Sequence, residues 1–124
     1  MPTILTVDDS RMIRKAVTRV LQKFQCRIVE AEDGAVGLAQ TVVEKPDLII
    51  LDYNMPVMDG VEMLKHLRND PAIKSTKVIF LTANSGPEIM RMAVSLGVRD
   101  YILKPFNDDD LISKISRQVS LIPL

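Results

Sequence analysis

The run Leu48–Leu51 constrains the fold most, because four consecutive aliphatic residues are followed at once by a carboxylate, Asp52. A continuous apolar run of this length is typical of a strand that is buried on both faces, as in the middle of a parallel sheet. In open α/β sheets, ligand sites lie at the carboxyl ends of the strands. Asp52 is therefore the first candidate functional residue, and the turn-rich stretch 54–60 that follows it is expected to be a loop.

Strand-like and helix-like patterns alternate along the rest of the chain. The other strands are expected at residues 3–7, 27–31, 77–82 and 100–103. The helices are expected at residues 10–24, 33–45, 59–69, 86–97 and 108–120. Strict alternation of this kind predicts an α/β fold of five βα units, a doubly wound, flavodoxin-like sheet of five parallel strands with helices on both faces. Right-handed crossovers favour the strand order 2-1-3-4-5.

Composition narrows the class of protein. The chain has the size of one domain, so residues 1–124 are expected to fold as a single unit. Sixteen basic and sixteen acidic residues cancel, which argues against a general nucleic-acid or membrane binder. No apolar run approaches the roughly 18 residues of a membrane span, and the N-terminus does not look like a signal peptide. With a single cysteine, Cys26, the expected location is the cytoplasm.

Polar residues stand where four of the expected strands end. They are Asp8, Asp9, Asp52, Thr82 and Lys104. In the order 2-1-3-4-5 the first and third strands are neighbours about 4.8 Å apart, so Asp9 and Asp52 can reach one point. The fifth strand lies about 10 Å from the third, within reach of the Lys104 side chain. The sequence therefore predicts one site at one edge of the sheet.

The carboxylates of this site indicate a hard divalent cation. Asp8, Asp9 and Asp52 would repel one another, and without a counter-ion at least one pKa would rise. Carboxylate and carbonyl oxygens suit Mg²⁺, for which Mn²⁺ is a possible substitute. The single histidine, His66, lies in the third expected helix, so zinc and iron chemistry have no ligand set here.

An aspartate beside Mg²⁺ and a lysine is equipped to attack phosphorus as a nucleophile. The Lys104 ammonium can neutralise phosphoryl oxygens, and the Thr82 hydroxyl can donate a hydrogen bond to one of them. Asn54 stands two residues after Asp52, where a carboxylate would activate water. An acyl phosphate on Asp52 is therefore expected to persist as a signal, and the chain is not expected to be a turnover enzyme.

These residues together resemble the receiver (response-regulator) domain of bacterial two-component systems, especially its stand-alone chemotaxis type. The resemblance covers residues 3–119. It rests on Asp8-Asp9, the loop 52–60, Thr82-Ala83 and Lys104-Pro105-Phe106. Ordered spacings at the ends of four strands make it far more specific than any one motif.

The resemblance implies that Asp52 accepts a phosphoryl group from the phosphohistidine of a histidine kinase or phosphotransfer domain. It implies that Asp9 binds Mg²⁺ directly and that Asp8 binds it mostly through water. Asn54 would contribute its main-chain carbonyl. The side chains of Asn54 and Asn84 stand at positions that tune the lifetime of the phosphate in this family.

The resemblance also implies a switch. Thr82 and Lys104 would hold the phosphoryl oxygens, and Tyr101 would rotate inward as Thr82 moves toward the phosphate. The Lys104–Pro105 peptide bond would be cis. The alternative for Tyr101 is ordinary packing of a half-buried strand residue.

The expected downstream partner is a protein that binds the fourth helix, fifth strand and fifth helix. The segment 89–94 of the fourth helix contains two methionines, which adapt well to partners, although its helical spacing favours core packing first. No direct contact with nucleic acid or membrane is expected, and a monomer is favoured.

Several alternatives remain open from the sequence. The chain could be a receiver domain truncated from a larger regulator, with residues 120–124 as the link. It could be a phosphate-independent interaction module. A phosphohydrolase with an aspartyl-phosphate intermediate and a flavin-binding protein of the same topology are weaker alternatives, because no general base and no phosphate-cradling loop are evident.

Overall fold

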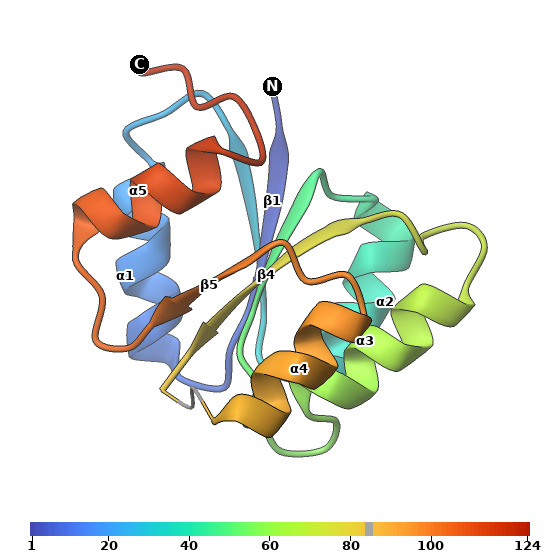
Figure 1. The fold of residues 1–124 in the computed structure, drawn as a ribbon. Helices are drawn as coiled ribbons and strands as arrows, with labels where there is room; N and C mark the ends of the chain where they lie inside the picture. Colours follow the sequence, from blue (N-terminus) through green and yellow to red (C-terminus); the bar gives the residue numbers. More distant parts are fainter. Residues whose placement is uncertain (84–85) are drawn as a thin grey trace.

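A computed structural model describes residues 1–83 and 86–124 and contains five parallel strands in the order β2-β1-β3-β4-β5 (Figure 1). The strands are β1 (Thr3–Val7), β2 (Arg27–Ala31), β3 (Leu48–Leu51), β4 (Lys77–Thr82) and β5 (Asp100–Leu103). The helices are α1 (Arg11–Leu21), α2 (Gly34–Glu44), α3 (Gly60–Asn69), α4 (Pro87–Ser95) and α5 (Asp108–Ser116). The predicted doubly wound fold and its strand order are confirmed. Asn84, predicted to tune phosphate lifetime, lies outside the described residues.

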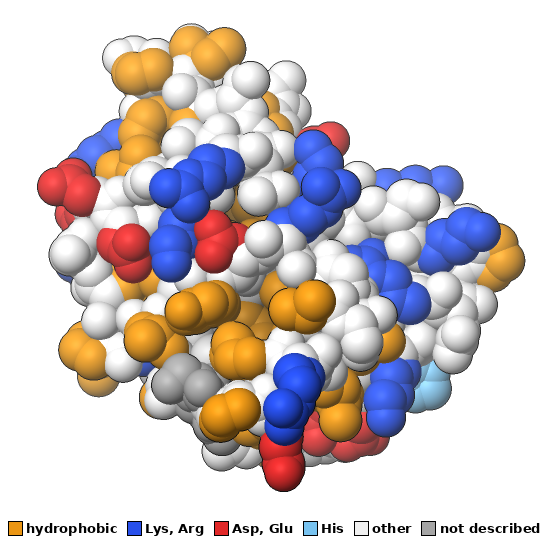
Figure 2. Space-filling view, in the orientation of Figure 1, with side chains coloured by type: hydrophobic (Ala, Val, Ile, Leu, Met, Phe, Trp, Pro, Cys, Tyr) orange, Lys and Arg blue, Asp and Glu red, His pale blue; other side chains and the backbone are white. Residues whose placement is uncertain are grey.

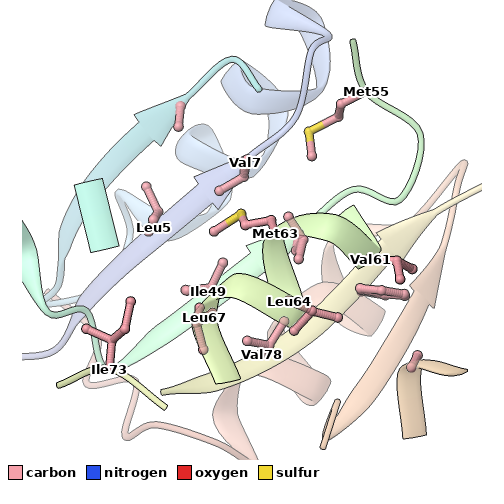
Figure 3. Packing of buried hydrophobic residues seen from close by; sticks show 14 residues of the cluster. Leu5, Val7, Ile49, Met55, Val61, Met63, Leu64, Leu67, Ile73 and Val78 are labelled. Atoms are coloured by element: carbon pink, nitrogen blue, oxygen red, sulfur yellow. The ribbon is translucent and has the colours of Figure 1, made fainter. Parts of the chain in front are cut away.

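Two hydrophobic cores lie on opposite faces of the sheet, and both draw on β3. Ile49 packs with α3 residues such as Met63 and Leu64, on the face that α2, α3 and α4 cover (Figures 1 and 3). Ile50 packs on the other face with residues of α1 and α5, among them Leu111. Because successive side chains of a strand point to opposite faces, β3 must be apolar at every position. This explains the continuous run Leu48–Leu51.

Local side-chain caps set where most helices begin. Ser10, Asp33, Asp59 and Asn107 each accept a hydrogen bond from the main-chain N–H three residues further on. This satisfies one of the donors that a helix start leaves unpaired. In α4, Pro87 takes the first helical position, where its missing N–H costs nothing.

Two helices end earlier than the apolar spacing predicts. The prediction that α1 continues to Phe24 is wrong, because α1 ends at Leu21 and Phe24 forms an antiparallel bridge with Pro123. The prediction that α5 reaches Ser120 is also wrong, because α5 ends at Ser116. The chain turns after α5 so that its last residues return to the α1–β2 connection, where the Leu124 N–H donates to the Lys23 carbonyl. Val119, beyond the end of α5, still packs against the core, so its helical spacing reflects packing and not helix.

None of the helices in residues 1–83 and 86–124 combines the length and apolar character needed to span a bilayer.

Candidate functional site

Three carboxylates meet at the carboxyl ends of β1 and β3. The Asp52 N–H donates to the Val7 carbonyl at 2.9 Å, so the parallel pairing of the two strands continues to the residue that carries the carboxylate. Carboxylate oxygens of Asp8, Asp9 and Asp52 all lie within 4.8 Å of one another. Asp8 is 1% exposed and Asp52 5%, whereas Asp9 is exposed to solvent. The convergence predicted from the strand order is therefore present in the structure.

Lys104 reaches this cluster from the end of β5. Its Nζ lies 2.8 Å from Asp8 Oδ2 and 3.4 Å from Asp52 Oδ1. The Lys104 N–H donates to the Thr82 carbonyl, which fixes the start of the loop against β4. The Lys104–Pro105 peptide bond is cis, as the resemblance implied. The sequence predicted that Lys104 would reach the site but not that it would lie between Asp8 and Asp52.

Burial dominates the electrostatics of Asp52. The removal of its carboxylate from water raises its pKa to about 6, and the neighbouring charge of Asp8 adds to this rise. The Lys104 ammonium acts in the opposite direction and only partly offsets the rise, and Asp9 adds a smaller upward contribution. At neutral pH Asp52 is mostly ionised, at a free-energy cost that a bound cation would relieve.

The donor set fits Mg²⁺. Asp8 Oδ1 accepts a hydrogen bond from the Ser10 N–H. Asp8 Oδ2 is buried and close to Lys104, but the approach lacks the geometry of a hydrogen bond, so within the described residues this oxygen keeps no hydrogen-bond partner. Three carboxylates gather around one ammonium, Lys104, and such an excess of carboxylate oxygens is a suitable ligand set for a hard cation. The exposed Asp9 side chain gives the cluster an opening to solvent.

The loop between β3 and α3 is held tightly against Asp52. A Cβ atom on Gly60 would lie 2.4 Å from the Asp52 carbonyl oxygen, so only glycine fits there without a shift of the backbone. The Gly60 N–H donates to the Tyr53 carbonyl at 2.8 Å. Asn54 is exposed in this loop, and Val57 adopts a φ of +68° with 81% of its surface exposed. Asn54 thus stands in the loop as predicted, and its role toward the metal stays a prediction.

The two predicted switch residues differ in environment. Thr82 is the last residue of β4, is 1% exposed and pairs in register with Leu103. Tyr101 is 42% exposed, which fits both the switch role and the alternative of half-buried packing. The Lys114 ammonium lies 4.9 Å from the centroid of the Tyr101 ring and donates to the Tyr101 carbonyl. The inward rotation of Tyr101 stays a prediction.

The sequence did not single out Arg14. In the structure its side chain contacts the main chain of Asp8, one of the three carboxylate residues. Its Nη1 donates to the Asp8 carbonyl at 2.6 Å, and its Nε donates to Glu30. In the sequence, Arg14 lies between the apolar residues Ile13 and Val17 of α1. Its position places it on the polar face of the helix, where a charged residue needs no special explanation. Spacing alone could not show that this face turns toward β2.

Comparison with known proteins identifies the family. A sequence model described as the response regulator receiver domain matches residues 4–116. The chain belongs to this family. The receiver domain is 32% identical to protein PilG of Pseudomonas aeruginosa, over 94% of this chain and 86% of that protein. It is 36% identical to the phosphate regulon transcriptional regulatory protein PhoB of Escherichia coli, over 90% of this chain.

The receiver domain also matches solved structures over nearly its whole length. The chemotaxis protein CheY4 of Vibrio cholerae superposes with a TM-score of 0.89 at 35% identity, covering 96% of this chain and 99% of that one. A putative response regulator from Chloroflexus aurantiacus gives a TM-score of 0.86 at 28% identity, covering 94% and 95%.

The relatives differ in length. The receiver domain spans 49% of PhoB and 7% of the hybrid signal transduction histidine kinase D of Dictyostelium discoideum. Membership of the family makes the chain a receiver domain of a two-component response regulator, which implies phosphorylation-dependent signalling as a switch.

Proposed function

We propose that residues 1–124 act as one receiver domain in which Asp52 is the phosphoacceptor. The observation that carries the proposal is the position of Asp52. Its buried carboxylate lies at the carboxyl end of the central strand, within 4.8 Å of two further carboxylates and 3.4 Å from the Lys104 ammonium. The donor is a phosphohistidine of a histidine kinase or phosphotransfer domain. Mg²⁺ would be held by Asp8, Asp9 and Asp52 together with the main-chain carbonyl of Asn54, and Mn²⁺ could replace it.

The reaction is a transfer of one phosphoryl group. An oxygen of the Asp52 carboxylate forms a bond to phosphorus, the bond from phosphorus to the donor imidazole nitrogen breaks, and the electron pair of that bond stays on the imidazole. The cation, when bound, offsets the charge of the carboxylates and of the phosphoryl oxygens. Lys104 exchanges its contact with Asp52 for one with a phosphoryl oxygen, and the Thr82 hydroxyl donates to another.

The chemistry favours storage of the phosphate over turnover. Asn54 stands two residues after Asp52, and an amide cannot take the proton of an attacking water as a carboxylate can. The protein therefore assists its own phosphorylation and slow dephosphorylation and does not act on an external phosphate ester.

The proposed output surface, to which a downstream partner binds, is the face formed by α4, β5 and α5. Hydrophobic side chains gather over α4 and β5 in Figure 2, and the exposed ones include Met92, Val94, Tyr101 and Leu103. Exposed apolar groups of this kind suit a protein partner. When Thr82 moves toward the phosphate, Tyr101 turns inward and this surface changes its affinity for a downstream protein or for a further domain of the same regulator.

Incubation with Mg²⁺ and acetyl phosphate tests the proposal. We expect intact-mass spectrometry to show a gain of one phosphoryl group. This gain should be absent when Mg²⁺ is chelated before acetyl phosphate is added, and absent in Asp52→Asn. Asp109→Asn, an exposed aspartate in the first turn of α5, is the matched control and should be phosphorylated like the parent protein. A phosphoryl group on any other residue would overturn the assignment. A parent protein that neither binds Mg²⁺ nor gains mass would favour the phosphate-independent interaction module.

A further inference from the structure

We propose that Arg14 is a positioning residue for the metal site and that Glu30 holds it in that role. Arg14 acts on the main chain between Asp8 and Asp9 and not on the phosphoryl group. The inference rests on the proposed function, because it assumes that Asp8 and Asp9 are ligands of Mg²⁺.

The Arg14 guanidinium joins three parts of the fold. From α1 it donates through Nη1 to the Asp8 carbonyl at 2.6 Å and through Nε to Glu30 Oε1 of β2 at 3.0 Å. Only 14% of the Arg14 side chain and 26% of the Glu30 side chain is exposed, so solvent screens this pair less than a surface pair. Two donors in a fixed planar fork therefore hold the Asp8 carbonyl at a set distance from β2.

The Asp8 carbonyl matters because it belongs to the peptide unit that leads into Asp9. The rest of Asp8 is already held, since its N–H donates to the Ala31 carbonyl and its Oδ1 accepts from the Ser10 N–H. Within the described residues, no hydrogen bond or ion pair holds the exposed Asp9 carboxylate itself. The direction of the Asp9 side chain therefore depends on its backbone, and the Arg14 contact fixes the plane of the preceding peptide.

Glu30 keeps the guanidinium charge away from the carboxylates. Without a partner, the Arg14 cation could turn toward the acidic cluster and compete with a metal for it. Glu30 accepts Nε through one oxygen, and its other oxygen accepts from the Thr18 hydroxyl at 3.4 Å and lies 3.7 Å from Lys15 Nζ. Glu30 is thus oriented by α1 on several sides and supplies the charge that balances Arg14.

A simpler role would be a tether between α1 and β2. A tether predicts that loss of Arg14 lowers the free energy of unfolding and leaves the affinity for Mg²⁺ unchanged. A positioning role predicts that the affinity for Mg²⁺ falls in the folded protein. Residues that orient metal ligands through a second layer of contacts commonly change metal affinity by about 10-fold or more when they are replaced.

The test is Mg²⁺ titration of Arg14→Met by calorimetry, with the amide NMR signals of Asp9 and Ser10 as a second readout. We expect the dissociation constant to rise about 10-fold and the metal-induced shifts of these amides to change. Arg27→Met is the matched control, because Arg27 forms the other arginine–glutamate pair of β2, with Glu44, at the opposite end of the strand. It should bind Mg²⁺ like the parent protein.

Two further variants separate positioning from tethering. Arg14→Lys keeps the charge but has one nitrogen where the guanidinium uses two, so we expect Mg²⁺ affinity to stay low while stability recovers. Glu30→Gln keeps an acceptor for Nε but leaves the Arg14 charge unbalanced, and it should also weaken Mg²⁺ binding. If Arg14→Met does not fold, Glu30→Gln alone decides the question.

The outcomes are distinct. A parent protein that binds Mg²⁺ with variants of equal affinity overturns the role of Arg14 and leaves the proposed function standing. A parent protein that does not bind Mg²⁺ overturns the proposed function and the inference with it.

Discussion

At the two ends of the sheet, charged side chains that are at least partly buried have opposite surroundings. At the end away from Asp52, the Arg68 guanidinium donates to the main-chain carbonyls of Lys74, Thr76, Leu96 and Gly97, at 2.7–3.4 Å. At the carboxyl end, Asp52 keeps a raised pKa, and one ammonium, that of Lys104, faces the three carboxylates of Asp8, Asp9 and Asp52. At the first end, the Arg68 charge is satisfied by main-chain carbonyls that it links together. At the second end, the carboxylates carry an excess negative charge that a bound cation would offset. The carboxyl end should therefore limit stability, and the opposite end should support it.

The largest expected change in the free energy of unfolding comes from Arg68, at the end of the sheet away from Asp52. Arg68→Met removes the donor that links the end of α3, the segment before β4 and the turn after α4, and we expect a loss of about 3 kcal/mol in the free energy of unfolding. Burial and the nearby Arg99 already lower the pKa of Arg68, which shows that its charge is partly desolvated. Urea unfolding provides the measurement. Arg91→Met, at an exposed position of α4, is the control and should change stability by less than about 0.5 kcal/mol. An equally small effect of Arg68→Met would contradict this role.

A smaller effect of opposite sign is expected at Asp52. Because the folded-state pKa is about 6 and the ordinary value is 3.8, the folded protein binds more protons between these pH values than the unfolded chain. Stability due to this group therefore falls as pH rises through that window. Without metal, Asp52→Asn should nearly match the parent protein near pH 4 and exceed it by roughly 2–3 kcal/mol above pH 6. Mg²⁺ should narrow the gap at pH 7.

Thermal unfolding in chelator across pH 4–8 checks this dependence, with Asp109→Asn as the variant that should show no such difference. A gap between Asp52→Asn and the parent protein that does not grow with pH would mean that the Asp52 carboxylate is not under electrostatic stress.

The smallest expected effect on stability concerns Val57 and Lys45, two residues with a left-handed backbone conformation. Val57, in the loop after Asp52, has a φ of +68°, and Lys45, at the end of α2, has a φ of +45°. A β-branched side chain fits this region worst, whereas asparagine enters it readily. Val57→Asn should stabilise the protein by about 1 kcal/mol, and Lys45→Asn should gain less than about 0.5 kcal/mol. Equal gains in urea unfolding would mean that the loop beside the site carries no extra backbone strain.

The sequence predicted those features that depend on local chemistry or on a regular pattern. Helix starts were predictable because Ser10, Asp33 and Asp59 act within their own first turn. The strand order followed from the alternation of strands and helices, and it brought Asp52 beside Asp8 and Asp9.

The features that the sequence did not predict depend on contacts between distant segments. Phe24, just beyond the end of α1, pairs with Pro123 near the other end of the chain. Arg14 looks like any polar residue of a surface helix until Glu30 of β2 and the Asp8 carbonyl are placed beside it. Tyr101 could not be assigned as buried or exposed, because the α4–β5–α5 surface that surrounds it comes from three separate elements.

The pairing of the chain ends has a practical consequence for measuring these reactions. The Pro2 carbonyl accepts from the Arg27 N–H and the Leu124 N–H donates to Lys23, so both termini lie on one side of the molecule, away from the carboxyl ends of the strands (Figure 1). An affinity tag, a dye or an anchor to a sensor surface can thus be joined at either terminus without crowding Asp52. Immobilised protein would present the proposed phosphorylation site to the solution in both attachments, and agreement between the two would show that the anchor does not affect the kinetics.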